Sequence, residues 1–180
     1  MCTQKTPEIL PYEVMPAAVK PWDPRSGEVA RRVFTLIESV FPEAVIEHIG
    51  STAVPGCDGK GVIDLMLIYP SGELERAKQA VDGLGFQRWE APGAHPDTRP
   101  VRIGAVDHDG TRFRIHVHLI APESEEVEAQ RRFRDRLLAD PALVEEYVAT
   151  KRAIIAQGIT YGPAFSDAKS AFIRNARESL

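Results

Sequence analysis

The spacing of hydrophobic residues changes twice in the first half of the chain, and each change marks a new element. Between Asp23 and Phe41 apolar residues recur every three or four positions, which predicts an amphipathic helix that buries Val29, Val33, Phe34 and Ile37. Two short apolar runs, near 44 to 49 and 62 to 69, predict strands joined by a loop of small residues. The stretch from Ser71 to about Leu84 predicts a second helix that begins with Ser71 as its cap.

The middle of the chain predicts a β-hairpin. Residues 86 to 90 suit a short strand, and a loop with three prolines and a glycine follows from 91 to 100. Strands from 101 to 106 and from 112 to 120 then flank Asp109-Gly110, a pair that favours a tight turn. In the second strand apolar and polar residues alternate, so we expect one core face and one polar, cationic face with Arg112, Arg114, His116 and His118.

The last third of the chain is helical in pattern. We predict helices from Glu123 to Ala139, from Pro141 to Gln157 and from about Pro163 onward. The order of elements indicates an α+β fold, with a mixed β-sheet, helices packed on one face, and a helical C-terminal part over residues 122–180. We expect one domain over residues 1–180, with the proline-rich residues 1–22 as an extended arm.

Composition narrows the classes of partner and location. The 180 residues carry a formal net charge of -4, so we expect no duplex nucleic acid partner, whereas small anionic ligands remain open. No run approaches the ~20 apolar residues that cross a bilayer, and the first residues lack the apolar core of a secretory signal. The two cysteines, Cys2 and Cys57, are far apart, which fits a reducing compartment. We therefore expect a cytoplasmic protein without membrane contact, and we make no prediction of its oligomeric state.

The loop after the first predicted strand and the acid in the second strand are the main candidates for chemistry. Gly50, Ser51 and Thr52 offer a flexible backbone and two hydroxyls, a composition that can hold an anion. Asp64 lies in the apolar run Val62-Ile63-Asp64-Leu65, where its neighbours cannot solvate a charge. A cation, a hydrogen-bond network or a solvent-filled cleft must compensate it, which indicates a site.

Two histidines on the predicted polar face can join Asp64. His116 and His118 are two residues apart on a strand and share a face, so with Asp64 they form a two-histidine, one-carboxylate set that can chelate a transition metal. The alternatives are plain polar surface, or rings that hydrogen-bond to a phosphate or to Asp64.

Several basic residues can line an anion pocket together: Lys60, Arg114, Arg134, Lys151 and Lys169. His48, at the mouth of the loop, can donate a hydrogen bond to the same anion. The alternatives are solvated surface cations or ion pairs between helices, and for His48 a half-buried ring that is satisfied within the fold. The ion-pair interpretation is strongest for Arg134, which precedes Asp135 in a helix.

Several separated motifs resemble the GrpB family, and the likeness covers nearly the whole chain. They are Glu47 to Gly56, Lys60, Ile63-Asp64, Ile115 to His118, Phe133 to Leu138, Tyr147, Lys151 and Asp167 to Ile173. Gly50-Ser51 followed by Asp64 also resembles the nucleotidyltransferase fold of the DNA polymerase beta superfamily. That resemblance implies a Gly-Ser loop that holds a nucleotide triphosphate, and carboxylates that bind two divalent ions, Mg²⁺ or Mn²⁺.

The chain departs from the superfamily pattern at one position. The second acid is expected two residues after the first, and here that residue is Met66. Three hypotheses follow. The first is a nucleotidyltransferase-like protein that binds a nucleotide or phosphorylated small molecule, with Asp64 as catalytic metal ligand. The second is a non-catalytic nucleotide- or anion-binding protein, and the third is a transition-metal site of Asp64, His116 and His118.

Overall fold

Alternating apolar residues assemble five strands into one mixed sheet, as predicted. The strand order is β1-β2-β5-β4-β3, and β2 and β5 run parallel while the other neighbours run antiparallel. In this order β2 and β5 are neighbours, although α2, β3 and β4 separate them along the chain.

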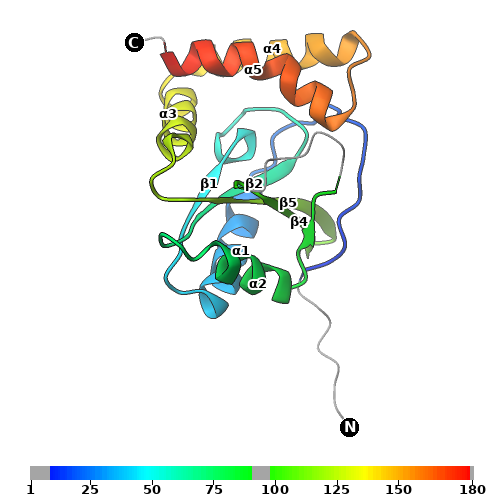
Figure 1. Ribbon diagram of the computed structural model, residues 1–180. Coiled ribbons are helices and arrows are strands. Elements are labelled where there is room, and N and C mark those ends of the chain that lie inside the picture. The colour runs from blue at the N-terminus through cyan, green and yellow to red at the C-terminus, as the bar shows by residue number, and fades with distance from the viewer. Residues whose placement is uncertain (1–8, 91–97, 179–180) are drawn as a thin grey trace.

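The computed structural model describes residues 9–90 and 98–178 (Figure 1). Cys2, the first part of the arm and residues 91–97 of the proline-containing loop lie outside the described residues. The elements are α1 (Ser26–Val40), β1 (Val45–Ile49), the short 3-10 turn η1 (Ser51–Ala53), β2 (Val62–Ile68), α2 (Leu74–Gly83), β3 (Gln87–Arg88), β4 (Val101–His108), β5 (Thr111–Ile120), α3 (Glu125–Ala139), α4 (Pro141–Ala156) and α5 (Gly162–Glu178).

The main core lies between one face of the sheet and the helices α1 and α2. Val29, Val33 and Ile37 of α1 pack there against apolar residues of the two parallel strands, which are Ile63, Leu65, Leu67, Phe113, Ile115, Val117 and Leu119. This arrangement confirms the predicted alternation in β5 and the helix pair on one face. The opposite face of β2 and β5 carries the polar side chains.

The C-terminal helices lie across that opposite face, and Figure 1 shows the sheet between them and the pair α1 and α2. Val127 of α3 packs on buried Met66 of β2, which anchors one end of the helical part. The helices also share an aromatic contact in which the Tyr147 and Phe172 rings stack, with centroids 5.1 Å apart. The helical part therefore covers the polar face of the sheet, and space remains between the helices and that face.

Two helix starts differ from the prediction. The second helix begins at Leu74, because Gly72 takes a left-handed φ of 82° that interrupts helical geometry. Ser71 does not cap it, and its hydroxyl donates to Glu123 at 3.2 Å. The first helix begins at Ser26, after a turn in which the Asp23 carboxylate accepts from the Arg25 backbone N–H at 2.9 Å. The β4–β5 turn is as expected, since Asp109 and Gly110 take φ of 46° and 71°.

The described part of the arm runs along three separate segments of the fold. Backbone hydrogen bonds join Leu10 to Ala105 of β4, Ala17 to Thr160 after α4, and Lys20 to Gly59 after the small-residue loop. The arm thus ties the sheet to the helical part. Within the described residues, no helix combines the length and apolar character needed to cross a membrane.

The contact of the arm with β4 gives a stability prediction. A Cβ atom at Gly104 would lie 2.6 Å from Ile9 Cγ2 and 2.9 Å from Phe86 Cδ1, so Gly104→Ala is expected to lower the free energy of unfolding by about 1–3 kcal/mol. Gly27→Ala, in α1 with open space around it, is the matched control and is expected to keep or slightly raise stability. Urea denaturation measures both, and equal stabilities would contradict this packing.

Candidate functional site

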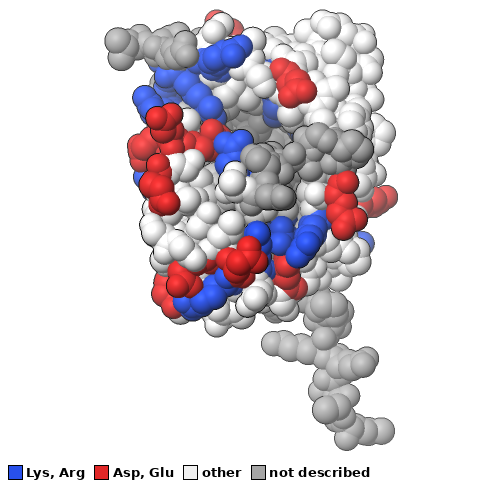
Figure 2. Space-filling view, viewed as in Figure 1, with Lys and Arg blue, Asp and Glu red and all other residues white. Residues whose placement is uncertain are grey.

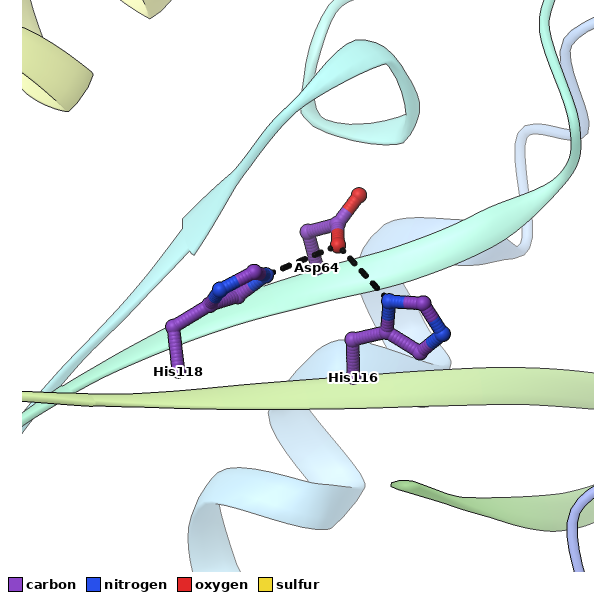
Figure 3. Close-up of side chains that lie close together, drawn as sticks. All are labelled: Asp64, His116 and His118. Atoms are coloured by element: carbon purple, nitrogen blue, oxygen red, sulfur yellow. Dashed lines mark hydrogen bonds and ion pairs between the residues drawn. The ribbon is translucent and has the colours of Figure 1, made fainter. Parts of the chain in front are cut away.

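The pairing of β2 with β5 brings Asp64, His116 and His118 together. The parallel register aligns Asp64 with His116 and Met66 with His118, so all of these side chains project from one face. Asp64 Oδ1 lies 3.0 Å from His118 Nε2 and 3.5 Å from His116 Nδ1 (Figure 3). One ligand atom from each of the three residues lies within 4.8 Å of the others. The predicted set is therefore a spatial cluster.

The charge state of this cluster suits a cation. Burial alone would raise the pKa of Asp64, but hydrogen bonds from His116 and His118 outweigh it and hold that pKa well below its ordinary value. Burial also lowers the pKa of His116, despite the nearby carboxylate. The cluster thus combines an ionised carboxylate with a neutral imidazole at His116, and the side chain of Asp64 is still 28% exposed.

A cavity of about 420 Å³ lies in front of Asp64, between the polar face of the sheet and the C-terminal helices. Among the described residues that line it, basic side chains outnumber acidic ones: Lys60, Arg99, Lys169 and Arg177 against Asp64 and Asp167. In the space-filling view, basic side chains gather beside a hollow on this face (Figure 2). Arg99 and Arg177 form ion pairs with Glu126 at 3.1 Å and 3.3 Å, so Lys60 and Lys169 are the lining cations that favour an anionic ligand.

Lys60 and Lys169 line the cavity and both lie near the ring of Phe165. Their Nζ atoms lie 5.3 Å and 5.4 Å from the centroid of Phe165. Burial, with help from the second ammonium, lowers the pKa of Lys60 to about 8. Arg114 is turned away from this cavity and its Nη2 donates to the Lys60 carbonyl at 2.7 Å. Two of the predicted cations therefore line the cavity with Asp64, and Arg114 supports one of them.

Gly50 brings the small-residue loop against Asp64. Its φ is 71°, and a Cβ atom there would lie 2.9 Å from Asp64 Oδ2, so a side chain would collide with the carboxylate. Ser51 turns its hydroxyl to Lys151, whose Nζ donates to it at 3.1 Å. Gly50 thus lines the cavity, and anion binding by the loop stays a prediction.

Lys151 of α4 is 2% exposed, and its ammonium contacts the small-residue loop. Besides Ser51, its ammonium donates to the Asp58 carbonyl and lies 4.2 Å from the Tyr147 ring centroid. Burial lowers the pKa of Lys151 to about 8. These contacts make Lys151 a link between α4 and the loop, outside the lining of the cavity.

The structure does not bring His48 and Thr52 to the cavity. His48 pairs with Leu65 in the β1–β2 register, so its ring projects from the face opposite to Asp64. There its Nε2 lies 2.9 Å from Thr52 Oγ1, and the Thr52 hydroxyl donates to the Val62 carbonyl at 3.3 Å. Burial lowers the pKa of His48 to about 4. This geometry matches the alternative interpretation of His48, a half-buried ring whose hydrogen bond is made within the fold.

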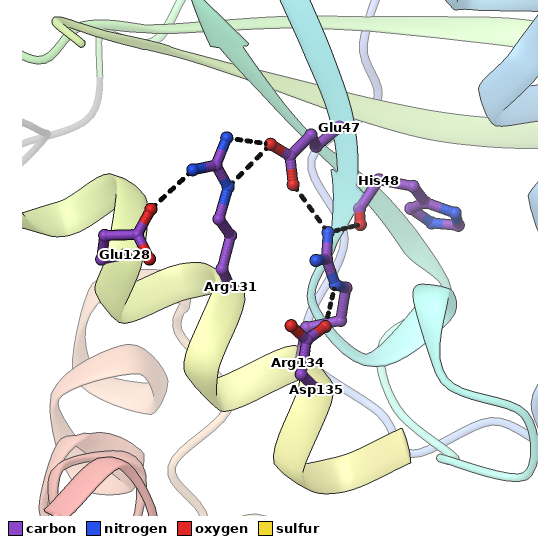
Figure 4. A network of polar contacts seen from close by, with 6 residues as sticks. All are labelled: Glu47, His48, Glu128, Arg131, Arg134 and Asp135. Carbon is purple, nitrogen blue, oxygen red and sulfur yellow. Dashed lines mark hydrogen bonds and ion pairs between the residues drawn. The ribbon is translucent and has the colours of Figure 1, made fainter. Parts of the chain in front are cut away.

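Arg134 takes part in an ion-pair network that joins α3 to β1 (Figure 4). Its Nη1 lies 2.9 Å from Glu47 Oε2 and its Nε lies 2.8 Å from Asp135 Oδ1. Arg131 binds the other oxygen of Glu47 at 2.5 Å. This geometry matches the ion-pair alternative for Arg134. Glu47 itself was not singled out from the sequence, because its partners lie more than 80 positions away.

Two further residues of the site were not predicted. The Tyr12 hydroxyl lies 2.9 Å from His116 Nε2, and the Trp89 ring lies 5.4 Å from the His116 ring between centroids. Tyr12 is 104 positions from His116, so no local spacing could indicate the contact. Asp167 belongs to a motif that resembled the family, but only the position of α5 shows that it lines the cavity.

Comparisons with known sequences give a family. A family model described as GrpB protein matches residues 16–179. A UPF0157 protein of Pseudomonas aeruginosa is 33% identical over 144 residues, which are 79% of this chain and 56% of that protein. A UPF0157 protein of Streptomyces coelicolor is 28% identical over 159 residues, which are 88% of this chain and 81% of that protein. The chain thus spans little more than half the length of the Pseudomonas relative.

Comparisons with solved structures give the fold. The crystal structure of conserved protein GrpB from Enterococcus faecalis has a TM-score of 0.71 at 22% identity, over 89% of this chain and 95% of that one. A GLD-2/RNP-8 complex gives a TM-score of 0.54 at 14% identity, over 84% and 59%. A structure of Cid1, titled for its RNA terminal uridylyl transferase activity, gives 0.51 at 12% identity, over 72% and 39%. These likenesses assign a nucleotidyltransferase-like fold.

The position of His48 gives a prediction of pH dependence. The folded protein holds the pKa of His48 at about 4 and the ordinary value is 6.5, so the unfolded chain binds a proton in this window that the folded protein excludes. The free energy of unfolding therefore falls as pH drops from 6.5 toward 4. His48→Gln is expected to reduce that fall by about 1–3 kcal/mol. Urea denaturation at pH 7, 6 and 5 measures it, and parallel pH curves for variant and wild type would contradict the buried neutral ring.

Proposed function

The chain belongs to the GrpB family, and from that premise we propose a metal-dependent binding site for a phosphorylated ligand. Asp64, His116 and His118 hold one divalent ion, and the cavity in front of them takes a nucleotide or another phosphorylated small molecule. One observation carries the proposal: three ligand atoms lie within 4.8 Å of one another at the floor of a cavity whose charged lining is mostly basic. The likeness to nucleotidyltransferases supports the choice of ligand by analogy.

The donor set indicates which metal fits. Imidazole nitrogens suit Zn²⁺ or Fe²⁺, whereas Mg²⁺ prefers oxygen ligands, so the two histidines favour a transition metal. Met66 occupies the position of a second carboxylate and is fully buried against Val127. A pair of Mg²⁺ ions therefore lacks a ligand here, and we assign one metal to the site.

The residues around the cluster have separate roles in this proposal. Asp64 supplies the charge that offsets the cation, and the imidazoles complete its coordination. Lys60 and Lys169, which line the same cavity, bind phosphate oxygens. Gly50 lets the loop backbone approach the ligand without a side chain in between. When bound, a divalent ion lowers the pKa of an attacking hydroxyl and stabilises charge on a phosphoryl group.

The reaction class that follows is transfer of a nucleotidyl group in the cytoplasm. The second candidate is a binding protein without catalysis, and Met66 favours it because two-metal transfer needs a carboxylate at that position. The two candidates differ in what metal removal does. A catalytic site needs Asp64 and the ion for turnover, whereas an anion-binding loop keeps its ligand in EDTA.

A nucleotide assay separates these candidates. With labelled nucleoside triphosphates, Mn²⁺ and a cell extract as source of acceptors, we expect pyrophosphate release that EDTA abolishes and that Asp64→Asn lowers at least 100-fold. Asp107→Asn, an exposed carboxylate paired with Arg112, is the matched control and keeps activity. Nucleotide binding that survives both EDTA and Asp64→Asn, without turnover, would overturn the catalytic proposal in favour of the binding protein.

The hydrogen bond of Tyr12 predicts its effect on metal affinity. With a metal on His116 Nδ1, the Nε2–H donates to the Tyr12 hydroxyl, as partners of metal-bound histidines usually accept. Tyr12→Phe is expected to weaken Zn²⁺ or Mn²⁺ binding roughly 10–100-fold. His118→Ala, which removes a ligand, should weaken it further, and exposed Tyr161→Phe serves as control. Titration calorimetry and elemental analysis measure these affinities, and a wild-type protein without stoichiometric metal would exclude the site.

A further inference from the structure

A second cavity of about 570 Å³ opens directly beside the first. The two share five lining residues, which are Lys60, Val62, Trp89, His116 and Gly162. Each volume falls in the range of about 300–1,000 Å³ that is typical of small-molecule sites. One ligand can therefore extend from the first cavity into the second past His116 and Lys60.

Apolar residues dominate the lining of the second cavity, and its charged residues other than Lys60 are Arg114 and Glu90, which have opposite signs. Of the six large hydrophobic side chains that are exposed among the described residues, three line it: Val14 at 73%, Met15 at 44% and Tyr161 at 53% exposure. The other three, Val40, Val45 and Leu138, are absent from its lining. Grouped exposed apolar residues around a cavity indicate a binding surface, since single ones need no explanation.

Aromatic rings lie where the two cavities meet. Tyr12, Trp89 and His116 contact one another, with ring centroids 5.3 Å to 5.9 Å apart. Tyr161 adds a fourth ring to the lining of the second cavity. Clustered rings of this kind prefer another ring as a partner, because edge and face contacts add to the burial of apolar area.

We propose that this second cavity binds a planar, uncharged aromatic group carried by the same molecule whose phosphate occupies the first cavity. The inference rests on the proposed function and narrows its substrate class to aryl or nucleobase phosphates. Charge supports the orientation: Lys60 stands at the junction and Lys169 lines the first cavity only. The second cavity has Arg114, which donates to the Lys60 carbonyl, and Glu90 of opposite charge, so the neutral end of the ligand points toward Val14 and Met15. A simple aliphatic phosphate fills the space without the ring contacts.

Three small phosphates of similar charge test whether the second cavity prefers an aromatic group. Inorganic phosphate, cyclohexyl phosphate and phenyl phosphate are titrated into the full chain with Mn²⁺, and calorimetry gives each Kd. We expect phenyl phosphate to bind roughly tenfold more tightly than inorganic phosphate and several-fold more tightly than cyclohexyl phosphate. Equal affinities for phenyl and inorganic phosphate would overturn the inference, and so would cyclohexyl phosphate that binds as tightly as phenyl phosphate.

A charge placed in the second cavity tests whether the gain in affinity for phenyl phosphate arises there. Val14→Glu, at an exposed position of the arm, is expected to remove most of the gain for phenyl phosphate and leave the Kd of inorganic phosphate unchanged. Leu138→Glu, at another exposed apolar position but on α3, is the matched control. A gain that survives Val14→Glu overturns the location. Failure of the proposed function gives a different result. In that case inorganic phosphate does not bind the wild type with Mn²⁺, and the binding of phenyl phosphate measures the second cavity alone.

Discussion

The parallel alignment of β2 with β5 is the constraint on which the site depends. It places Asp64 beside His116 and Met66 beside His118, on the face that α1 and α2 do not cover. A register shift of one residue would turn the imidazoles into the core and expose apolar side chains to the cavity. The burial of Ile115 and Val117 opposite to the site therefore fixes the register, and with it the positions of the two ring nitrogens near the carboxylate.

The space in front of the cluster depends on charged contacts between the helical part and the sheet. Glu47 of β1 receives Arg131 and Arg134 of α3, and Asp58 receives Arg152 of α4. Lys151 adds a buried ammonium with partners in the loop. Partly buried pairs of this kind are sensitive to geometry, because a lost partner leaves an uncompensated charge. They hold α3 and α4 over the polar face while the cavity beneath stays open.

The local pattern predicted most of the fold and several of the residues that lie together at the cavity. Hydrophobic spacing was sufficient for the helices and strands, and alternation in residues 112 to 120 assigned the core and polar faces correctly. The start of α2 was wrong, because the conformation of Gly72 rather than the hydroxyl of Ser71 decides it. Asp64, His116 and His118 were predictable as a set because strand periodicity is strict. His48 and Arg134 were not, since their partners Thr52 and Glu47 turn them away from the cavity.

By itself, the sequence determined which residues can form strands and helices, which face of each is apolar, and that one acid in an apolar strand needs compensation. Those properties are local, because they follow from side-chain periodicity and solvation. Only the tertiary structure decided which distant groups meet: Tyr12 with His116, Lys151 with the loop, and α5 with the cavity in front of Asp64. Such contacts depend on how strands order and how helices dock, and many different pairings of the same local elements satisfy the same sequence pattern.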